Sequence, residues 1–233
     1  MSSRLLQYRG GLTAQQAAEG IALARSNAAR LIQDAEILLE ANRHPSAIAL
    51  AILAIEELGK VQVLKIIVLQ ANEATLKQAW KDYRSHRAKN VQWILPALAA
   101  QGARTLAQVR AAADIDGDHT MMLDTIKQLA LYTDCFNAAP RWSDPSLAVD
   151  PAFADAILAV AKVLNRDAAT SVRELELWIE LVGPYYKTAS MVEALLRWQQ
   201  AMFDEGLTKT TTAEMEAFVR GKSVEVKSRP DAV

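Results

Sequence analysis

Apolar residues recur at three- and four-residue steps over most of the chain, which is the period of an amphipathic helix. The first such run begins at Thr13, which can form a capping box with Gln16, and extends to about Asn42. After a break at residues 44–46, a second helix is predicted over about 46–70. Its first half, AIALAILAI, is apolar on every side. We therefore expect this segment to lie at the centre of the fold.

The same periodicity continues toward the C-terminus. A third helix is predicted from about Glu73 to Ala100, with Pro96 bending it or ending it early. Further helices are expected over about 121–137, 151–170, 171–183, 187–203 and from Thr211 onward. No strand pattern is found, and only seven prolines and nine glycines interrupt the chain. The sequence thus predicts an all-α helical bundle with additional C-terminal helices.

The breaks also suggest a domain organisation. Residues 1–12 are expected to form an N-terminal arm, and residues 13–222 a single helical domain. Within that domain we distinguish a core, 13–139, from a C-terminal helical part, 151–222. The polar segment 223–233 is expected to be a flexible tail.

Charge and cysteine content narrow the classes of function. The 26 basic and 27 acidic residues give a formal net charge of −1, so a polyanion would have to be bound by local residues. The one cysteine excludes an intramolecular disulfide and a multi-cysteine zinc site. The longest apolar run is far shorter than the ~20 residues that span a bilayer. We therefore expect a cytoplasmic protein without a membrane partner.

The segment AIEELGK places charges directly after the apolar run. Glu56 and Lys60 are four residues apart and can pair along one stripe, while Glu57 lies about 100° further round and needs another partner. In the simplest alternative, Glu56 and Lys60 are an ordinary surface pair and Glu57 is solvated. Gly59, inside a helix, indicates close approach of another backbone.

A second polar cluster lies in KDYRSHRAKN. Steps of four and three residues place Asp82, His86 and Lys89 on one helical face, with Arg84 and Arg87 nearby. In this arrangement the carboxylate can fix the imidazole tautomer and the ammonium can hold a phosphate. The alternative is a histidine with a purely structural role.

The two clusters can meet. If the second and third helices are antiparallel neighbours, Glu56 or Glu57 lies at the same height as His86, which allows a composite site. Other chemistries lack their motifs: no histidine has a glutamate three residues before it, and no glycine-rich phosphate loop is present. We therefore expect neither a metal nor a cofactor.

Three segments taken in order resemble one known family. They are SNAARLIQDAEILLEANRHPSAIALAILAIEELGK, then YRSHRAKN, then LALYTDCFNAAPRWSDPS, which holds the W-x-x-P of Trp142 to Pro145. Over about residues 20–150 the chain resembles the AbiV family of bacterial abortive-infection proteins, a branch of the all-helical HEPN superfamily.

This resemblance implies a toxin-like phage-defence protein that stops growth of the infected cell, acts on RNA or translation, and forms a homodimer. Active HEPN ribonucleases carry an arginine, a polar residue, three variable positions and a histidine. The nearest match here runs from Lys81 to His86, with lysine in place of arginine. Lysine supplies charge but not the two-point guanidinium fork.

The leading hypothesis is therefore a metal-independent endoribonuclease that acts on RNA such as tRNA or mRNA and responds to a phage-encoded activator protein. The residues expected to be catalytic are His86, Lys81, Glu56 and Glu57. Those expected to bind RNA are Arg84, Arg87 and Lys89, with Asp82 and Lys60 as support. The rival hypothesis is a non-catalytic HEPN module that binds a phage protein, tRNA or the translation machinery.

Overall fold

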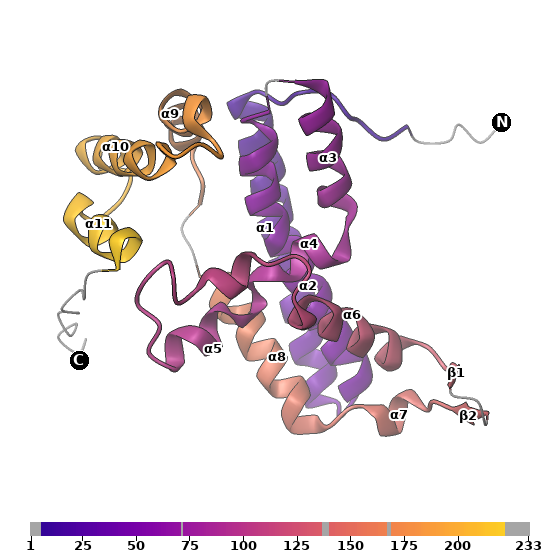
Figure 1. The fold of residues 1–233 in the computed structure, drawn as a ribbon. Coiled ribbons are helices and arrows are strands. Elements are labelled where there is room, and N and C mark those ends of the chain that lie inside the picture. Colours follow the sequence, from indigo (N-terminus) through magenta and orange to yellow (C-terminus); the bar gives the residue numbers. More distant parts are fainter. Residues whose placement is uncertain (1–5, 71, 137–139, 167–168, 222–233) are drawn as a thin grey trace.

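A computed structural model describes residues 6–70, 72–136, 140–166 and 169–221, and it is predominantly helical (Figure 1). The all-α prediction is thereby confirmed. Residues 1–5 of the predicted arm and the predicted tail, 223–233, lie outside the described residues. No helix within the described residues combines the length and the apolar character that a membrane crossing requires.

A pair of long helices forms the centre of the fold. Helix α1 (Ala14–Glu40) begins on the predicted capping box, in which the backbone N–H of Gln16 donates to Oγ1 of Thr13 (3.2 Å). Helix α2 (His44–Ile67) packs along α1. The apolar run in α2 is buried as predicted, and its seven most buried members are at most 2% exposed: Ala47, Ile48, Ala49, Ala51, Ile52, Ala54 and Ile55.

Two further helices close the core around α2. Helix α6 (Asp118–Leu131) and helix α8 (Pro151–Leu164) both pack on α2. Helix α8 begins where the sequence predicts, because Oδ1 of Asp150 accepts from the N–H of Ala152 (2.7 Å). The surface of α2 is thus covered on several sides, which explains why its sequence shows so little polar periodicity.

The third predicted helix is broken, and the prediction of one continuous helix is wrong. The segment consists of α3 (Glu73–Arg84), α4 (His86–Asn90), the 3-10 turn η1 (Val91–Ile94) and α5 (Leu95–Ala100). Ser85 adopts an extended conformation (φ −80°, ψ 127°), and its Oγ accepts from the N–H of Ala88 (3.3 Å). Serine favours this capping role over a helix interior. Asp82 and His86 therefore do not share a helical face.

The segment after α6 contains a short hairpin that the sequence analysis did not predict. Strands β1 (Cys135–Phe136) and β2 (Arg141–Trp142) pair antiparallel and precede the single turn α7 (Pro145–Ala148). Two-residue strands are too short to show an alternating pattern. Trp142 of β2 is 74% exposed and Leu147 of α7 is 85% exposed, so the hairpin and the turn after it present apolar side chains to solvent.

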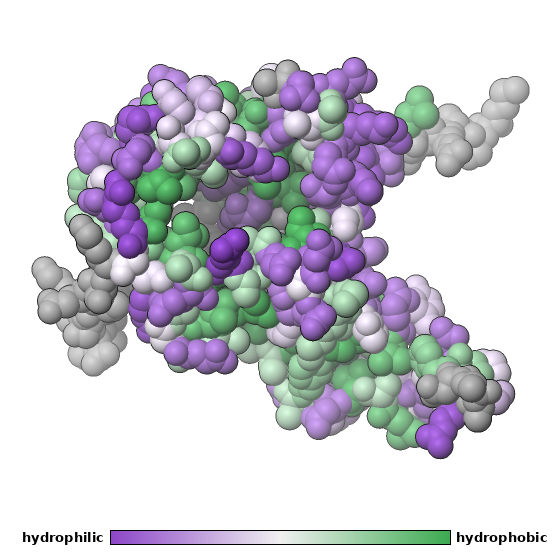
Figure 2. All heavy atoms as spheres, in the orientation of Figure 1, coloured by the Kyte–Doolittle hydropathy of each residue, from purple (hydrophilic) through white to green (hydrophobic). Residues whose placement is uncertain are grey.

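The C-terminal helices form a separate layer against one end of α1 and α2 (Figure 1). They comprise α9 (Val172–Leu181), the turn η3 (Gly183–Tyr185), α10 (Met191–Asp204) and α11 (Thr212–Arg220). The indole N–H of Trp178 donates to the carbonyl of Lys65 (2.9 Å), which fixes α9 to α2. A cleft of about 900 Å³ separates this layer from α2, η1 and the turn η2 (Arg110–Ala113), and it is visible as a hollow in Figure 2.

Candidate active site

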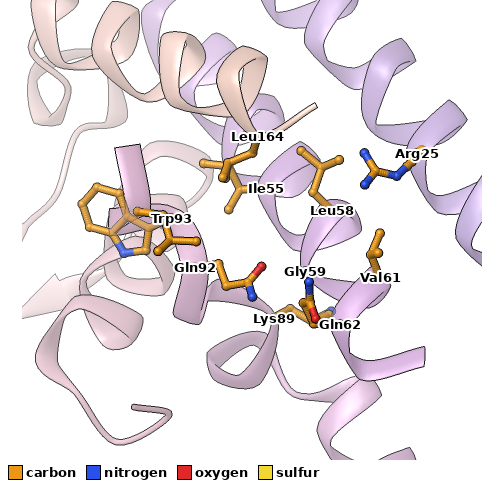
Figure 3. A pocket seen from close by; sticks show the side chains of 11 residues that line it. Arg25, Ile55, Leu58, Gly59, Val61, Gln62, Lys89, Gln92, Trp93 and Leu164 are labelled. Atoms are coloured by element: carbon orange, nitrogen blue, oxygen red, sulfur yellow. The ribbon is translucent and has the colours of Figure 1, made fainter. Parts of the chain in front are cut away.

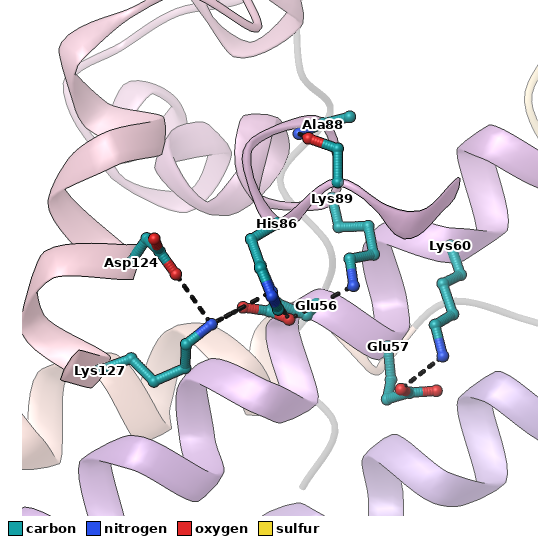
Figure 4. Close-up of polar contacts among 9 residues, drawn as sticks. Glu56, Glu57, Lys60, His86, Ala88, Lys89, Asp124 and Lys127 are labelled. Atoms are coloured by element: carbon teal, nitrogen blue, oxygen red, sulfur yellow. Dashed lines mark hydrogen bonds and ion pairs between the residues drawn. The ribbon is translucent and has the colours of Figure 1, made fainter. Parts of the chain in front are cut away.

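A buried carboxylate lies at the centre of the candidate site. Glu56 of α2 is 3% exposed, and three donors from other helices surround it (Figure 4). Its Oε1 accepts from Nζ of Lys127 (2.6 Å), while its Oε2 lies 2.7 Å from Nδ1 of His86 and 3.4 Å from Nζ of Lys89. Burial of an unpaired carboxylate is costly. These three contacts are what allow the charge to remain inside the protein.

The strongest of these partners is Lys127 on α6. Its side chain is 5% exposed, and its ammonium also contacts Oδ1 of Asp124 (3.0 Å). Burial alone would lower the pKa of Lys127, but hydrogen bonds to Glu56 and Asp124, together with their charge, outweigh it and raise the pKa. Lys127 therefore remains an ammonium ion at neutral pH.

His86 is the member of the cluster that reaches solvent. It is the first residue of α4, and its side chain is 50% exposed although Nδ1 contacts the buried Glu56. We assign the proton to Nδ1, because the carboxylate at 2.7 Å is an acceptor, while Nζ of Lys127 lies further away at 3.2 Å. No described residue pairs with Nε2. Glu56 thus orients the imidazole through Nδ1, and Nε2 carries a lone pair that can accept a proton.

The position of α4 depends on Gly59. A Cβ atom at residue 59 would lie 1.9 Å from the carbonyl oxygen of Lys89, so only glycine allows this approach. The predicted close approach of another backbone at Gly59 is thereby confirmed. A small cavity of about 150 Å³ lies beside the contact, lined in part by Gln62 and Gln92 (Figure 3). The contact sets the distance of both His86 and Lys89 from Glu56.

The charged residues next to Glu56 pair differently from the sequence prediction. Lys60 contacts Oε1 of Glu57 (2.6 Å) rather than Glu56, and its ammonium lies 5.5 Å from the ring centre of Tyr83. Neither the predicted Glu56–Lys60 pair nor the solvated Glu57 of the alternative is present. Glu57 and Lys60 form a separate pair beside the buried cluster (Figure 4).

The residues of α3 lie away from His86. Asp82 accepts from the side-chain amide of Gln78 (2.7 Å), so its predicted contact with His86 is not formed. Together with burial, its charge raises the pKa of Tyr186. Lys81 lines a groove against the N-terminal arm, and none of the contacts of the described residues joins it to the cluster around Glu56.

The two predicted RNA-binding arginines have different surroundings. Arg84 donates to the carbonyls of Trp80 and Tyr8, both at 2.9 Å, and so holds the arm against α3. Arg87 lies one residue after His86 and contacts the exposed Asp116 (3.3 Å). Of the residues predicted for the site, the structure therefore brings together Glu56, His86 and Lys89, with Arg87 adjacent.

Sequence reasoning missed Lys127 and Asp124. A signal for Lys127 exists, because it lies on a stripe with Thr120, Leu123 and Ala130 at steps of three and four residues, and all four are buried. A lysine on the buried face of a helix requires a partner. Nothing in the local sequence identifies that partner as Glu56, which lies 71 residues earlier.

The same cluster contains metal-ligand types. Ligand atoms of Glu56, His86 and Asp124 lie within 4.8 Å of one another. The ammonium of Lys127 contacts all three residues, at 2.6, 3.2 and 3.0 Å. A metal ion at their centre would have to displace this ammonium, so the residues present fit an internal cation better than a bound one.

Comparisons with known proteins agree with the resemblance seen in the sequence. A HEPN family model described as AbiV matches residues 16–166, which is more than half of the chain and includes Glu56, His86, Lys89 and Lys127. No curated protein and no solved structure matches the chain. With its helical fold and the family match, the chain belongs to the AbiV family of HEPN abortive-infection proteins.

Proposed function

We propose that the protein is a metal-independent endoribonuclease that arrests growth of phage-infected bacterial cells from within the cytoplasm. The observation that carries the proposal is His86, whose Nδ1 is held by the buried Glu56 while its ring is half exposed. A solvent-accessible imidazole oriented by a carboxylate is the arrangement that general base catalysis requires. The distance of 2.7 Å between Nδ1 and Oε2 fixes both the tautomer and the ring orientation.

The reaction uses the 2′-hydroxyl of the RNA as nucleophile. Nε2 of His86 takes the hydroxyl proton, O2′ forms a bond to the adjacent phosphorus, and the bond from phosphorus to O5′ breaks. The departing O5′ takes a proton from water. The products are a 2′,3′-cyclic phosphate and a 5′-hydroxyl end, with no change of oxidation state.

Cations near His86 offset the charge that develops on the phosphorus oxygens. Lys89 shares Glu56 with His86, and Arg87 follows His86 directly in the chain. Lys89 and Lys127 are already partly neutralised by Glu56. We therefore propose that a homodimer adds further cations. From the membership of an abortive-infection family, we also propose that a phage-encoded protein triggers activity.

The test is RNA cleavage with analysis of the new ends. His86→Ala should reduce cleavage by about 10²- to 10⁴-fold, which is the usual contribution of a positioned general base. His44→Ala, at the start of α2, is the matched control and should cleave normally. Both variants need a thermal unfolding midpoint close to that of the parent protein, so that loss of chemistry is separated from loss of fold.

A second function, the non-catalytic binding module, is favoured by one observation. The two lysines near His86 both contact Glu56, as expected of a structural ion-pair network. In that case His86→Ala would still arrest growth and cellular RNA would remain intact. This result would exclude the ribonuclease and leave the binding module.

A further inference from the structure

A groove lies between the N-terminal arm and α3, on a different part of the surface from Glu56. It has a volume of about 470 Å³, and its eight lining residues are Gln7, Arg9, Ala74, Lys77, Gln78, Trp80, Lys81 and Arg84. Four of these carry a positive charge, and none of the described residues that line the groove is acidic. The protein as a whole has a net charge of −1, so this local excess of positive charge is not a consequence of composition.

Three of the four cations are available to a ligand. No described carboxylate pairs with Arg9, Lys77 or Lys81, and all three are exposed. Elsewhere in the described structure many cations are neutralised, as Lys65 is by Glu174 (2.6 Å) and Arg173 is by Glu205 (2.7 Å). Unpaired cations held close together repel one another, and an anionic ligand relieves that repulsion.

Specific contacts hold the arm that forms one wall of the groove. The indole N–H of Trp80 donates to the carbonyl of Gly10 (2.9 Å), and the guanidinium of Arg84 donates to the carbonyl of Tyr8 (2.9 Å). The rings of Tyr8 and Trp80 meet edge to face, with centroids 5.9 Å apart. These contacts bring Arg9 of the arm to the same groove as Lys77 and Lys81 of α3.

We propose that this groove binds the phosphodiester backbone of single-stranded RNA, an inference that rests on the proposed ribonuclease function for the identity of the polyanion. Lys77 and Lys81 are one helical turn apart, a rise of about 6 Å, which suits successive phosphates of one strand. Among the described residues that line the groove, Trp80 is the one aromatic residue, and it is 7% exposed, with its ring beneath Arg84. The groove therefore offers phosphate contacts without a stacking platform for bases, and it binds RNA with little preference for sequence.

This assignment gives Lys81 a role in binding rather than in catalysis. The lining residues run along α3 from Ala74 to Arg84, its last residue, and α4 begins at His86, so the groove extends along α3 to the end from which α4 starts. An RNA strand held there is delivered to the neighbourhood of His86.

The test measures binding to fluorescent oligouridylate by anisotropy over a range of salt concentrations. All proteins carry His86→Ala, so the RNA stays intact and binding is separated from cleavage. The groove variant combines Arg9→Gln, Lys77→Gln and Lys81→Gln. The matched control combines Arg43→Gln, Arg141→Gln and Lys209→Gln, which removes the same charge from exposed positions that have no described carboxylate partner.

We expect the groove variant to bind RNA at least about tenfold more weakly at ~0.1 M salt. The slope of the logarithm of its binding constant against the logarithm of the salt concentration should be shallower by about 2, because each lost phosphate contact removes ~0.7 from this slope for a single strand. The control should bind like the parent, and oligoadenylate should bind like oligouridylate. Equal losses in both variants, unchanged binding in the groove variant, or preference for a duplex or an acidic peptide would overturn the proposal.

Failure of this proposal differs from failure of the proposed function. If the groove variant binds normally while the protein with His86 intact cleaves RNA, the groove is wrong and the ribonuclease stands. If RNA binds through the groove but the protein with His86 intact cleaves none, the groove stands and the ribonuclease is wrong.

Discussion

Replacement of Lys127 by methionine tests the account of the buried cluster most directly. Lys127→Met keeps an unbranched side chain but removes the ammonium that contacts Glu56 at 2.6 Å and Asp124 at 3.0 Å. The carboxylate of Glu56, 3% exposed, then retains only Nδ1 of His86 at 2.7 Å and Nζ of Lys89 at 3.4 Å. The variant therefore leaves a buried charge with weaker compensation.

Loss of one partner of a buried ion pair typically costs 3–5 kcal/mol in the free energy of unfolding. Because His86 and Lys89 remain, we expect Lys127→Met to fall at the lower end, about 3 kcal/mol. For a chain of this length, that loss corresponds to a fall of about 6–12 °C in the unfolding midpoint. Lys60→Met, which breaks the more exposed pair with Glu57, is the matched control and should cost less than about 1 kcal/mol.

The assay is urea unfolding followed by tryptophan fluorescence and circular dichroism, with the slope against urea compared between variants. The double variant Glu56→Gln with Lys127→Met removes both charges. We expect it to be more stable than the sum of the single effects predicts, by about 1–3 kcal/mol. A loss below about 1 kcal/mol in Lys127→Met, or strict additivity in the double variant, would refute the claim that Lys127 is the counterion of Glu56.

Ile52→Ala should cost about 2–5 kcal/mol of unfolding free energy, and Leu53→Ala should cost less, because Ile52 is fully buried and Leu53 only partly. Equal losses of the two variants in urea titrations would contradict this difference in burial. Because the pKa of Lys127 is raised in the folded protein, this residue contributes stability that is complete below about pH 10.5 and is lost as the pH rises through the higher folded value. The urea midpoint should therefore fall more steeply at alkaline pH in the parent than in Lys127→Met, and an equal pH dependence of the two midpoints would contradict this. Light scattering at micromolar concentration should return about twice the chain mass of 25.5 kDa, and a monomer that still cleaves RNA would exclude a site shared between two copies.

The contact between Glu56 and His86 could be anticipated because a helical hairpin relates the two residues. Only five residues of the chain separate α2 from α3, and α4 follows α3 directly after Ser85, so Glu56 and His86 lie at similar distances from this connection and meet at 2.7 Å. The burial of α2 can also be predicted from the sequence, because a helix that is apolar on every side is not stable at the surface of a protein in water. Both inferences depend only on periodicity and short connections.

Other features of the site depend on contacts between residues that are distant in the chain, and the local sequence does not determine these contacts. A helix permits Lys60 to pair with either Glu56 or Glu57, and the choice is settled by Lys127, which neutralises Glu56 from another helix. The break at Ser85 is a similar case. Serine is tolerated inside a helix, and here its capping of α4 accompanies the packing of α4 on Gly59.

The contact at Gly59 has a consequence for genetics. Any side chain at this position must push the carbonyl of Lys89 away, and α4 would carry His86 and Lys89 with it. On the proposed function, which arrests growth, a selection for cells that survive production of the protein should therefore recover substitutions at Gly59, although glycine contributes no functional group. Such escape alleles would produce a folded but inactive protein, and a second change that lets α4 settle in its shifted position would be recovered as their suppressor.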